Sequence, residues 1–241
     1  KKLISSGFAY IHVVPDMGII RGTTGVVSLI SDKPAESILV PERYMTLVFK
    51  TYSSAYPSTV SSILAELFQL KEDTFYYRKM RKRYSFHPSK RLDYRPELDV
   101  LYPYFKNKKQ FLITIKNIIQ QRMVELLSKE LKVNPVIVAH PDVWRRSIYP
   151  NMNVILPLRF KPPITSKFSL MGDKYKKKAE KEIYPEKLAE FFKTNKHISL
   201  TAPDVGDYKT LFKNIRILLK KGVSEAEIIK SLTATPAKML N

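Results

Sequence analysis

The chain has 241 residues, of which 44% are hydrophobic, so it is long enough to bury a full core as one large domain or two small ones. It contains no Cys, which excludes disulfides, thiolate metal sites and Cys nucleophiles, and its apolar runs are too short to predict a transmembrane segment. The formal net charge of +20 favours anionic partners such as nucleic acid, acidic lipid or acidic protein, although a basic proteome or an acidic neighbouring domain also explains it.

The first part of the chain is predicted to contain short strands followed by one long helix. Apolar runs predict strands over four segments: residues 8–14, which we expect to be buried, 24–30, 37–40 and 44–49. Residues 58–77 carry apolar side chains at helical spacing and predict the longest helix. Pro96 opens a further short helix over residues 96–102.

From residue 111 onward, short apolar strands alternate with helices. The predicted strands cover residues 111–115, 136–139, 153–156 and 198–201. The predicted helices cover residues 118–131, 142–147, 184–192 and 208–221. This alternation is typical of a parallel sheet covered by helices on both faces, so it predicts an α/β fold that is either a (β/α)8 barrel or a doubly wound sheet.

The end of the chain carries several local helix signals. Gly222 is expected to end the helix over residues 208–221, and Ser224 with Glu227 forms a capping box for the next helix. Thr235 is expected to be the N-cap of a last short helix, with Pro236 as its first residue.

Two basic segments hold much of the excess charge, residues 78–95 and 174–181, and both are expected to be solvated connections. We predict that they form a surface for an anion or an acidic partner, made of Arg78, Lys79, Arg81, Lys82, Arg83, Lys176, Lys177 and Lys178. Tyrosines lie between the basic residues, which leaves nucleic acid as a further alternative, although no nucleic-acid-binding module pattern is present.

Four histidines are the only imidazoles available for catalysis or metal binding. His140 follows the strand over residues 136–139, and Asp204 follows the strand over residues 198–201. In a barrel both would lie at the carboxyl face, where barrel chemistry occurs, although the favoured interpretation of His140 is a polar residue that closes its strand beside Pro141. His197 precedes its strand and should lie at the opposite face. His12 lies in an apolar run and is expected to be a hydrogen-bonded core residue.

Three segments resemble the amidohydrolase superfamily, and in particular its imidazolonepropionase-like members from Bacteroidetes-type bacteria. They are SSGFAYIHVVPDMGIIRGTTGVVSL (residues 5–29), YPSTVSSILAELFQLKEDTFYY (56–77) and GVSEAEIIKSLTATPAKML (222–240). RPELDVL, NVILPLRF and HISLTAPD also follow in the order of that family. The resemblance implies a TIM (β/α)8-type barrel that begins before its second strand, and therefore a single domain over residues 1–241 within a longer chain.

The resemblance also implies a binuclear Zn or Fe centre, from which this chain departs. The family takes His-x-His from the first strand, Lys or Glu from the fourth, His from the fifth and sixth, and Asp from the eighth. Here the first strand is absent, Thr114 stands near the fifth-strand position with Lys116 beside it, and His140 falls near the sixth-strand position. Asp204 is displaced by one residue, in the sequence Thr-Ala-Pro-Asp.

We therefore predict a catalytically degenerate amidohydrolase-like barrel that serves as a structural or interaction module in a larger protein or complex. The alternative is an active metal-dependent hydrolase of C–N bonds, with His140 as a metal ligand and Asp204 as the general base. A basic nucleic-acid-binding protein is the third hypothesis. The resemblance is compatible with export to the periplasm or cell envelope, and equally with a cytoplasmic location.

Overall fold

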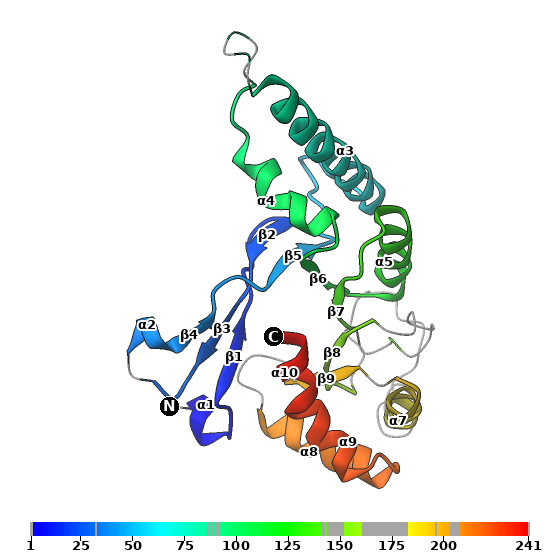
Figure 1. Cartoon of the computed structure of the whole chain (residues 1–241). Helices are drawn as coiled ribbons and strands as arrows, with labels where there is room; N and C mark the ends of the chain where they lie inside the picture. The colour runs from blue at the N-terminus through cyan, green and yellow to red at the C-terminus, as the bar shows by residue number, and fades with distance from the viewer. Residues whose placement is uncertain are drawn as a thin grey trace.

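Two β-sheets organise the described part of the chain, and most of the helices pack on the larger one (Figure 1). The computed structural model describes residues 2–31, 33–85, 87, 89, 92–140, 143, 152–160, 183–195, 197–202 and 208–240. None of the helices within these residues is both long enough and apolar enough to cross a bilayer. The fold is therefore of the predicted α/β class.

The smaller sheet is antiparallel, and its strands lie in the order β1 (Tyr10–Val13), β3 (Gly25–Ser28) and β4 (Ile38–Val40). Two short helices accompany it, α1 (Lys2–Ser5) and α2 (Pro34–Ser37). The expectation of a buried strand over residues 8–14 is wrong, because Tyr10 is 55% exposed and Val13 is 47% exposed. A local apolar run shows that a segment is extended, but it does not show whether another layer covers it.

The larger sheet is mixed, with five parallel strands and one antiparallel edge. Its order is β2 (Ile20–Thr23), β5 (Tyr44–Val48), β6 (Gln110–Thr114), β7 (Val136–Val138), β8 (Val154–Pro157) and β9 (Ile198–Thr201). Only the β2–β5 pair is antiparallel. Within the described residues β2 and β9 are not paired with each other, so this part of the chain forms an open sheet and not a closed barrel.

The main helices occupy the places that their apolar periodicity predicts. They are α3 (Val60–Tyr84), α4 (Pro96–Phe105), α5 (Ile118–Leu131), α7 (Tyr184–Thr194), α8 (Tyr208–Lys220), α9 (Glu225–Leu232) and α10 (Ala234–Leu240). The helix predicted over residues 142–147 falls outside the described residues, apart from Val143. The long helix continues to Tyr84, so the basic residues from Arg78 to Arg83 lie on a helix and not in a loop as expected.

Alternation along the parallel strands separates a helix-facing side of the sheet from an inner face. The helix-facing side chains, such as Leu47, Ile113 and Leu156, join the main core beneath the helices. The inner face carries Tyr44, Leu112, Val136, Val138 and Ile155, and Leu240 of α10 packs against these residues. The C-terminal helix therefore covers part of the face opposite the main core.

The predicted capping signals are largely confirmed. Gly222 has φ +84°, which glycine adopts without strain, and the Ser224–Glu227 capping box is formed at the start of α9. The prediction that Thr235 is an N-cap is wrong, because α10 already begins at Ala234 and Thr235 is buried within its first turn.

Candidate functional site

Parallel α/β sheets place their binding and catalytic groups at the carboxyl ends of the strands. After β5, β6, β7 and β8 the first residue is apolar, and the second is Lys50, Lys116, His140 or Arg159, respectively. The ladder continues one residue beyond β6 and β7, because the N–H groups of Ile115 and Ala139 donate to carbonyl oxygens of the neighbouring strand at 3.0 and 2.8 Å. Strand alternation therefore assigns Lys116 and His140 to the inner face.

The charges at this edge do not match a binuclear metal centre. Ammonium and guanidinium groups carry only donors, so among the four side chains only the imidazole of His140 offers a lone pair to a metal ion. His140 is buried, and its carbonyl oxygen accepts a hydrogen bond from Val143 N–H at 3.0 Å. Within the described residues, no three His, Asp or Glu side chains are grouped closely enough to hold a metal. Asp204 lies outside the described residues.

Amide side chains from the helices fix the backbone at the carboxyl edge. Gln120 of α5 accepts from Lys116 N–H at 2.8 Å and donates from Nε2 to Phe49 O at 3.3 Å, which joins the ends of β5 and β6. Asn214 of α8 donates from Nδ2 to Leu158 O at 2.8 Å. Neither residue was predicted from the sequence. Their signal in the sequence is an amide at a position where helical spacing predicts burial, because a buried amide requires a hydrogen-bond partner.

At the amino edge, a small polar cluster joins the two sheets. The ring of His12 in β1 meets Tyr44 of β5 edge-on, with ring centroids 5.7 Å apart. Burial, and then the positive charge of Arg43, lower the pKa of His12 from 6.5 to about 4. Burial raises the pKa of Tyr44, and Arg43 opposes that rise. The expectation of a hydrogen-bonded His12 is wrong, since its buried Nε2 has no hydrogen-bond partner within the described part of the chain.

His197 lies immediately before β9, and its carbonyl oxygen accepts from Val154 N–H at 2.9 Å. This position at the amino end of the strand agrees with the sequence prediction. His197 therefore lies at the amino end of the strands, whereas His140 lies at their carboxyl end. The two imidazoles do not belong to one site.

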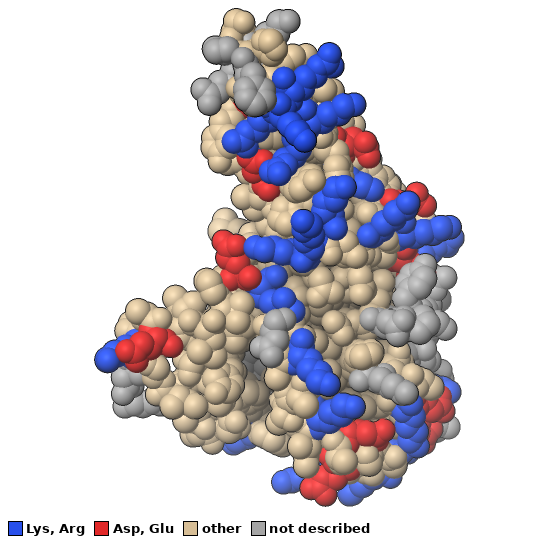
Figure 2. Space-filling model, in the orientation of Figure 1, with Lys and Arg blue, Asp and Glu red and all other residues tan. Residues whose placement is uncertain are grey.

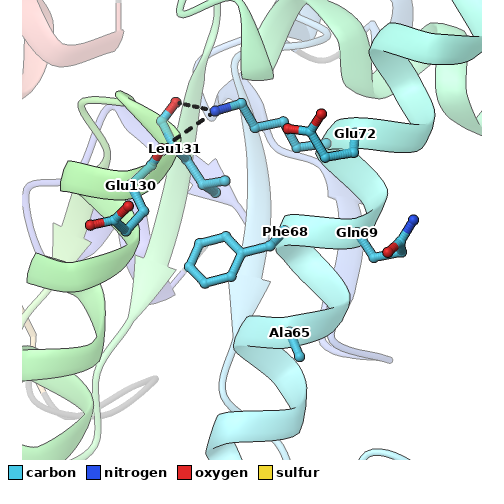
Figure 3. A pocket seen from close by; sticks show the side chains of 7 residues that line it. Ala65, Phe68, Gln69, Glu72, Glu130 and Leu131 are labelled. Carbon is cyan, nitrogen blue, oxygen red and sulfur yellow. Dashed lines mark hydrogen bonds between the residues drawn. The ribbon is translucent and has the colours of Figure 1, made fainter.

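Two surface cavities lined by described residues lie beside the sheet, away from its carboxyl edge. One of about 320 Å³ at the amino ends of β5, β6 and β7 is lined by Glu42, Arg43, Asn107, Lys108, Lys109, Gln110 and Asn134. The other, of about 310 Å³, lies between α3 and α5, where Phe68 points toward α5 and Lys71 donates to the carbonyl oxygens of Glu130 and Leu131 at 3.4 Å (Figure 3). Both are open depressions without a cluster of catalytic side chains.

The predicted partner surface is present in part on the second half of α3. Arg78, Lys79, Arg81, Lys82 and Arg83 are all exposed, and Figure 2 shows Lys and Arg gathered at the end of the molecule that α3 forms. Lys176, Lys177 and Lys178 fall outside the described residues. The α3 residues are therefore the part of that predicted surface for which the structure gives a geometry.

The comparisons with known proteins identify a fold and no activity. No protein-family model matches the sequence, and no curated protein matches it significantly. The structure is similar to the crystal structure of an amidohydrolase from Thermotoga maritima MSB8, with a TM-score of 0.77 and 16% sequence identity. The similarity covers 99% of this chain and 62% of the Thermotoga protein, so this chain spans about three-fifths of that length. The chain therefore has an amidohydrolase-like α/β fold.

Proposed function

We propose that this chain is a catalytically degenerate amidohydrolase-like module that serves as a structural or interaction part of a larger protein or complex. The observation that carries this proposal is the set of residues at the carboxyl edge, where Lys50, Lys116 and Arg159 accompany a single imidazole. A divalent ion placed there would be repelled by these cations, and the described residues offer it one imidazole instead of the several anionic or imidazole ligands that a hydrolytic centre uses. The amidohydrolase-like fold gives the ancestry, and the edge residues argue against the inherited chemistry.

The metal content of the purified protein tests this proposal. Purified protein is incubated with Zn²⁺ or Fe²⁺, desalted, and analysed for bound metal beside the variant His140→Ala. Bicarbonate is included because a lysine ligates a metal only after carboxylation of its amine. We expect less than about one metal equivalent per several chains, and the same value for the variant. One or more equivalents in the wild type, lost in His140→Ala, would overturn the proposal.

The alternative is a metal-dependent hydrolase of C–N bonds, and the buried His140 at the carboxyl edge favours it. In that case His140 would be a metal ligand, and Asp204 would act as general base on the water that attacks the amide carbon. Metal-dependent turnover of amides or cyclic amides, abolished separately by His140→Ala and Asp204→Asn, would establish this alternative. Turnover that survives both substitutions would have to come from a contaminant.

A further inference from the structure

The two halves of α3 carry net charge of opposite sign. Residues 60–73 contain three acidic residues and a single lysine, whereas residues 78–83 contain five cations and only Met80 in addition. Met80 is buried, which fixes how this turn is rotated and directs the cations outward. Five residue steps along a helix rise about 8 Å, so the cations form one compact patch at the end of α3 that lies away from the sheets (Figures 1 and 2).

Two of the five cations are already engaged with α4 and its preceding segment. Asp99 accepts from Arg78 Nη1 at 3.1 Å and also from Arg81 Nη1. The guanidinium of Arg78 lies 4.3 Å from the ring centroid of Tyr102, and that of Arg81 lies 5.5 Å from the ring centroid of Tyr94. These contacts hold both arginines in place and partly neutralise their charge.

The other three cations do not share these contacts, although the guanidinium of Arg83 lies 5.9 Å from the ring centroid of its neighbour Tyr84. Lys79, Lys82 and Arg83 are exposed, and no acidic group in the described part of the chain pairs with them. Spacings of three and four residues place them on one helix face, which Tyr76 shares at 65% exposure. Like charges at these spacings repel one another, so a ligand that supplies negative charge to this face would relieve that repulsion.

We propose that the face formed by Tyr76, Lys79, Lys82 and Arg83 docks a short acidic segment of a partner protein. The inference deepens the proposed role as an interaction module. A few carboxylates can match three cations within about 8 Å, with the tyrosine ring packing on the aliphatic parts of the segment. A nucleic acid is a poorer match, because its affinity rises with the number of phosphates that Lys and Arg neutralise, and this face of α3 supplies three cations.

The experiment measures fluorescence anisotropy of a labelled twelve-residue polyglutamate peptide at low salt. We expect binding by the wild-type chain and a loss of about tenfold or more in affinity for the triple variant Lys79→Glu, Lys82→Glu, Arg83→Glu. The matched control is Lys213→Glu, Arg216→Glu, Lys220→Glu on α8, which replaces two exposed lysines and one exposed arginine and changes the net charge equally. The control should stay within about twofold of wild type.

Three results would overturn the proposal: no peptide binding by the wild type, equal losses in both triple variants, or tighter binding of a twelve-nucleotide oligothymidylate that the α3 variant abolishes. The second result would mean that binding reports only net charge, and the third would assign the face to nucleic acid. If circular dichroism shows that the charge-reversal triple variant of α3 does not fold, the neutral triple variant Lys79→Gln, Lys82→Gln, Arg83→Gln replaces it. Metal content is measured on the same samples, so an active metal centre and a failed docking face are told apart.

Discussion

Arg43 donates hydrogen bonds from Nε and Nη2 to the carbonyl oxygen of Met239, at 3.0 and 2.7 Å, across 196 residues of sequence. The hydroxyl of Tyr44 donates to the same oxygen. Met239 lies in the last turn of α10, where carbonyl oxygens have no donor within the helix and a positive charge is favourable. The contact thus joins the end of α10 to the start of the first parallel strand.

Removing this contact should destabilise the fold. We expect Arg43→Ala to lower the free energy of unfolding by about 2 kcal/mol, because it removes two charge-assisted hydrogen bonds that are partly buried. Urea unfolding followed by circular dichroism measures the change. Arg21→Ala is the control, since Arg21 Nε donates only to Gly18 O three residues away, and it should cost less than about 1 kcal/mol. Similar losses in the two variants would contradict the linking role of Arg43.

Adjacent leucines on α5 provide a test of the core. Leu127 is fully buried in the main core, whereas Leu126 is 43% exposed. We expect Leu127→Ala to cost about 2–5 kcal/mol, from lost burial and the cavity that remains, and Leu126→Ala to cost less than about 1 kcal/mol. Both variants have the same helix propensity change, so denaturant unfolding isolates the difference in packing. If Leu126→Ala costs as much as Leu127→Ala, Leu127 does not lie on the buried face of α5.

Burial of His12 should make stability depend on pH. Because the pKa of His12 is about 4 in the fold and 6.5 ordinarily, the unfolded chain binds a proton more readily between these values. The contribution of the neutral His12 ring to the free energy of unfolding is complete above pH 6.5 and is lost as the pH falls toward 4. His12→Phe keeps an aromatic ring beside Tyr44 and cannot titrate, so its unfolding free energy should fall less than that of wild type between pH 7 and 4.5.

The control for this measurement is His87→Gln, which changes an exposed imidazole in the segment after α3. Its unfolding free energy should follow the wild-type curve over the same pH range. Parallel curves for wild type and His12→Phe would show that other groups account for the acid sensitivity.

The capping box of α9 gives a local prediction. Ser224 Oγ accepts from Glu227 N–H at 3.2 Å, and the carboxylate of Glu227 accepts from Ser224 N–H at 3.0 Å and from its hydroxyl at 2.8 Å. These hydrogen bonds from Ser224 are the main reason that the pKa of Glu227 is lowered. We expect Ser224→Ala to cost about 1 kcal/mol of unfolding free energy, whereas Ser224→Asn, which can still cap, should cost only a few tenths. Equal costs would mean that the cap contributes little.

Local sequence patterns were sufficient to predict where the helices lie, but not which strands pair with each other. The helix over residues 118–131 was predicted with the bounds that α5 has, because apolar periodicity is a local signal. The strand near residue 10 was recognised as extended, but its place in a separate, half-exposed sheet depends on distant partners. The last two turns of α3, from Arg78 to Tyr84, were missed because arginine and lysine favour helices without contributing an apolar stripe.

The candidate site was predictable to a similar degree. The place of His140 at the end of a strand follows from the run of apolar residues before it, and the structure has it there. The amide bridge from Gln120 to Phe49 was beyond prediction, since it joins residues 71 positions apart. Asp204 lies outside the described residues, so its role as general base stays a prediction.

The spatial order of the strands in the larger sheet repeats their order along the chain. During synthesis each new strand can therefore pair with the one that left the ribosome before it, and the growing sheet always ends in an unpaired edge. Helices α9 and α10, which pack against β9, are made after that strand. A product that stops before these helices would expose a strand edge together with the apolar inner face, and would aggregate instead of persisting as a smaller folded unit.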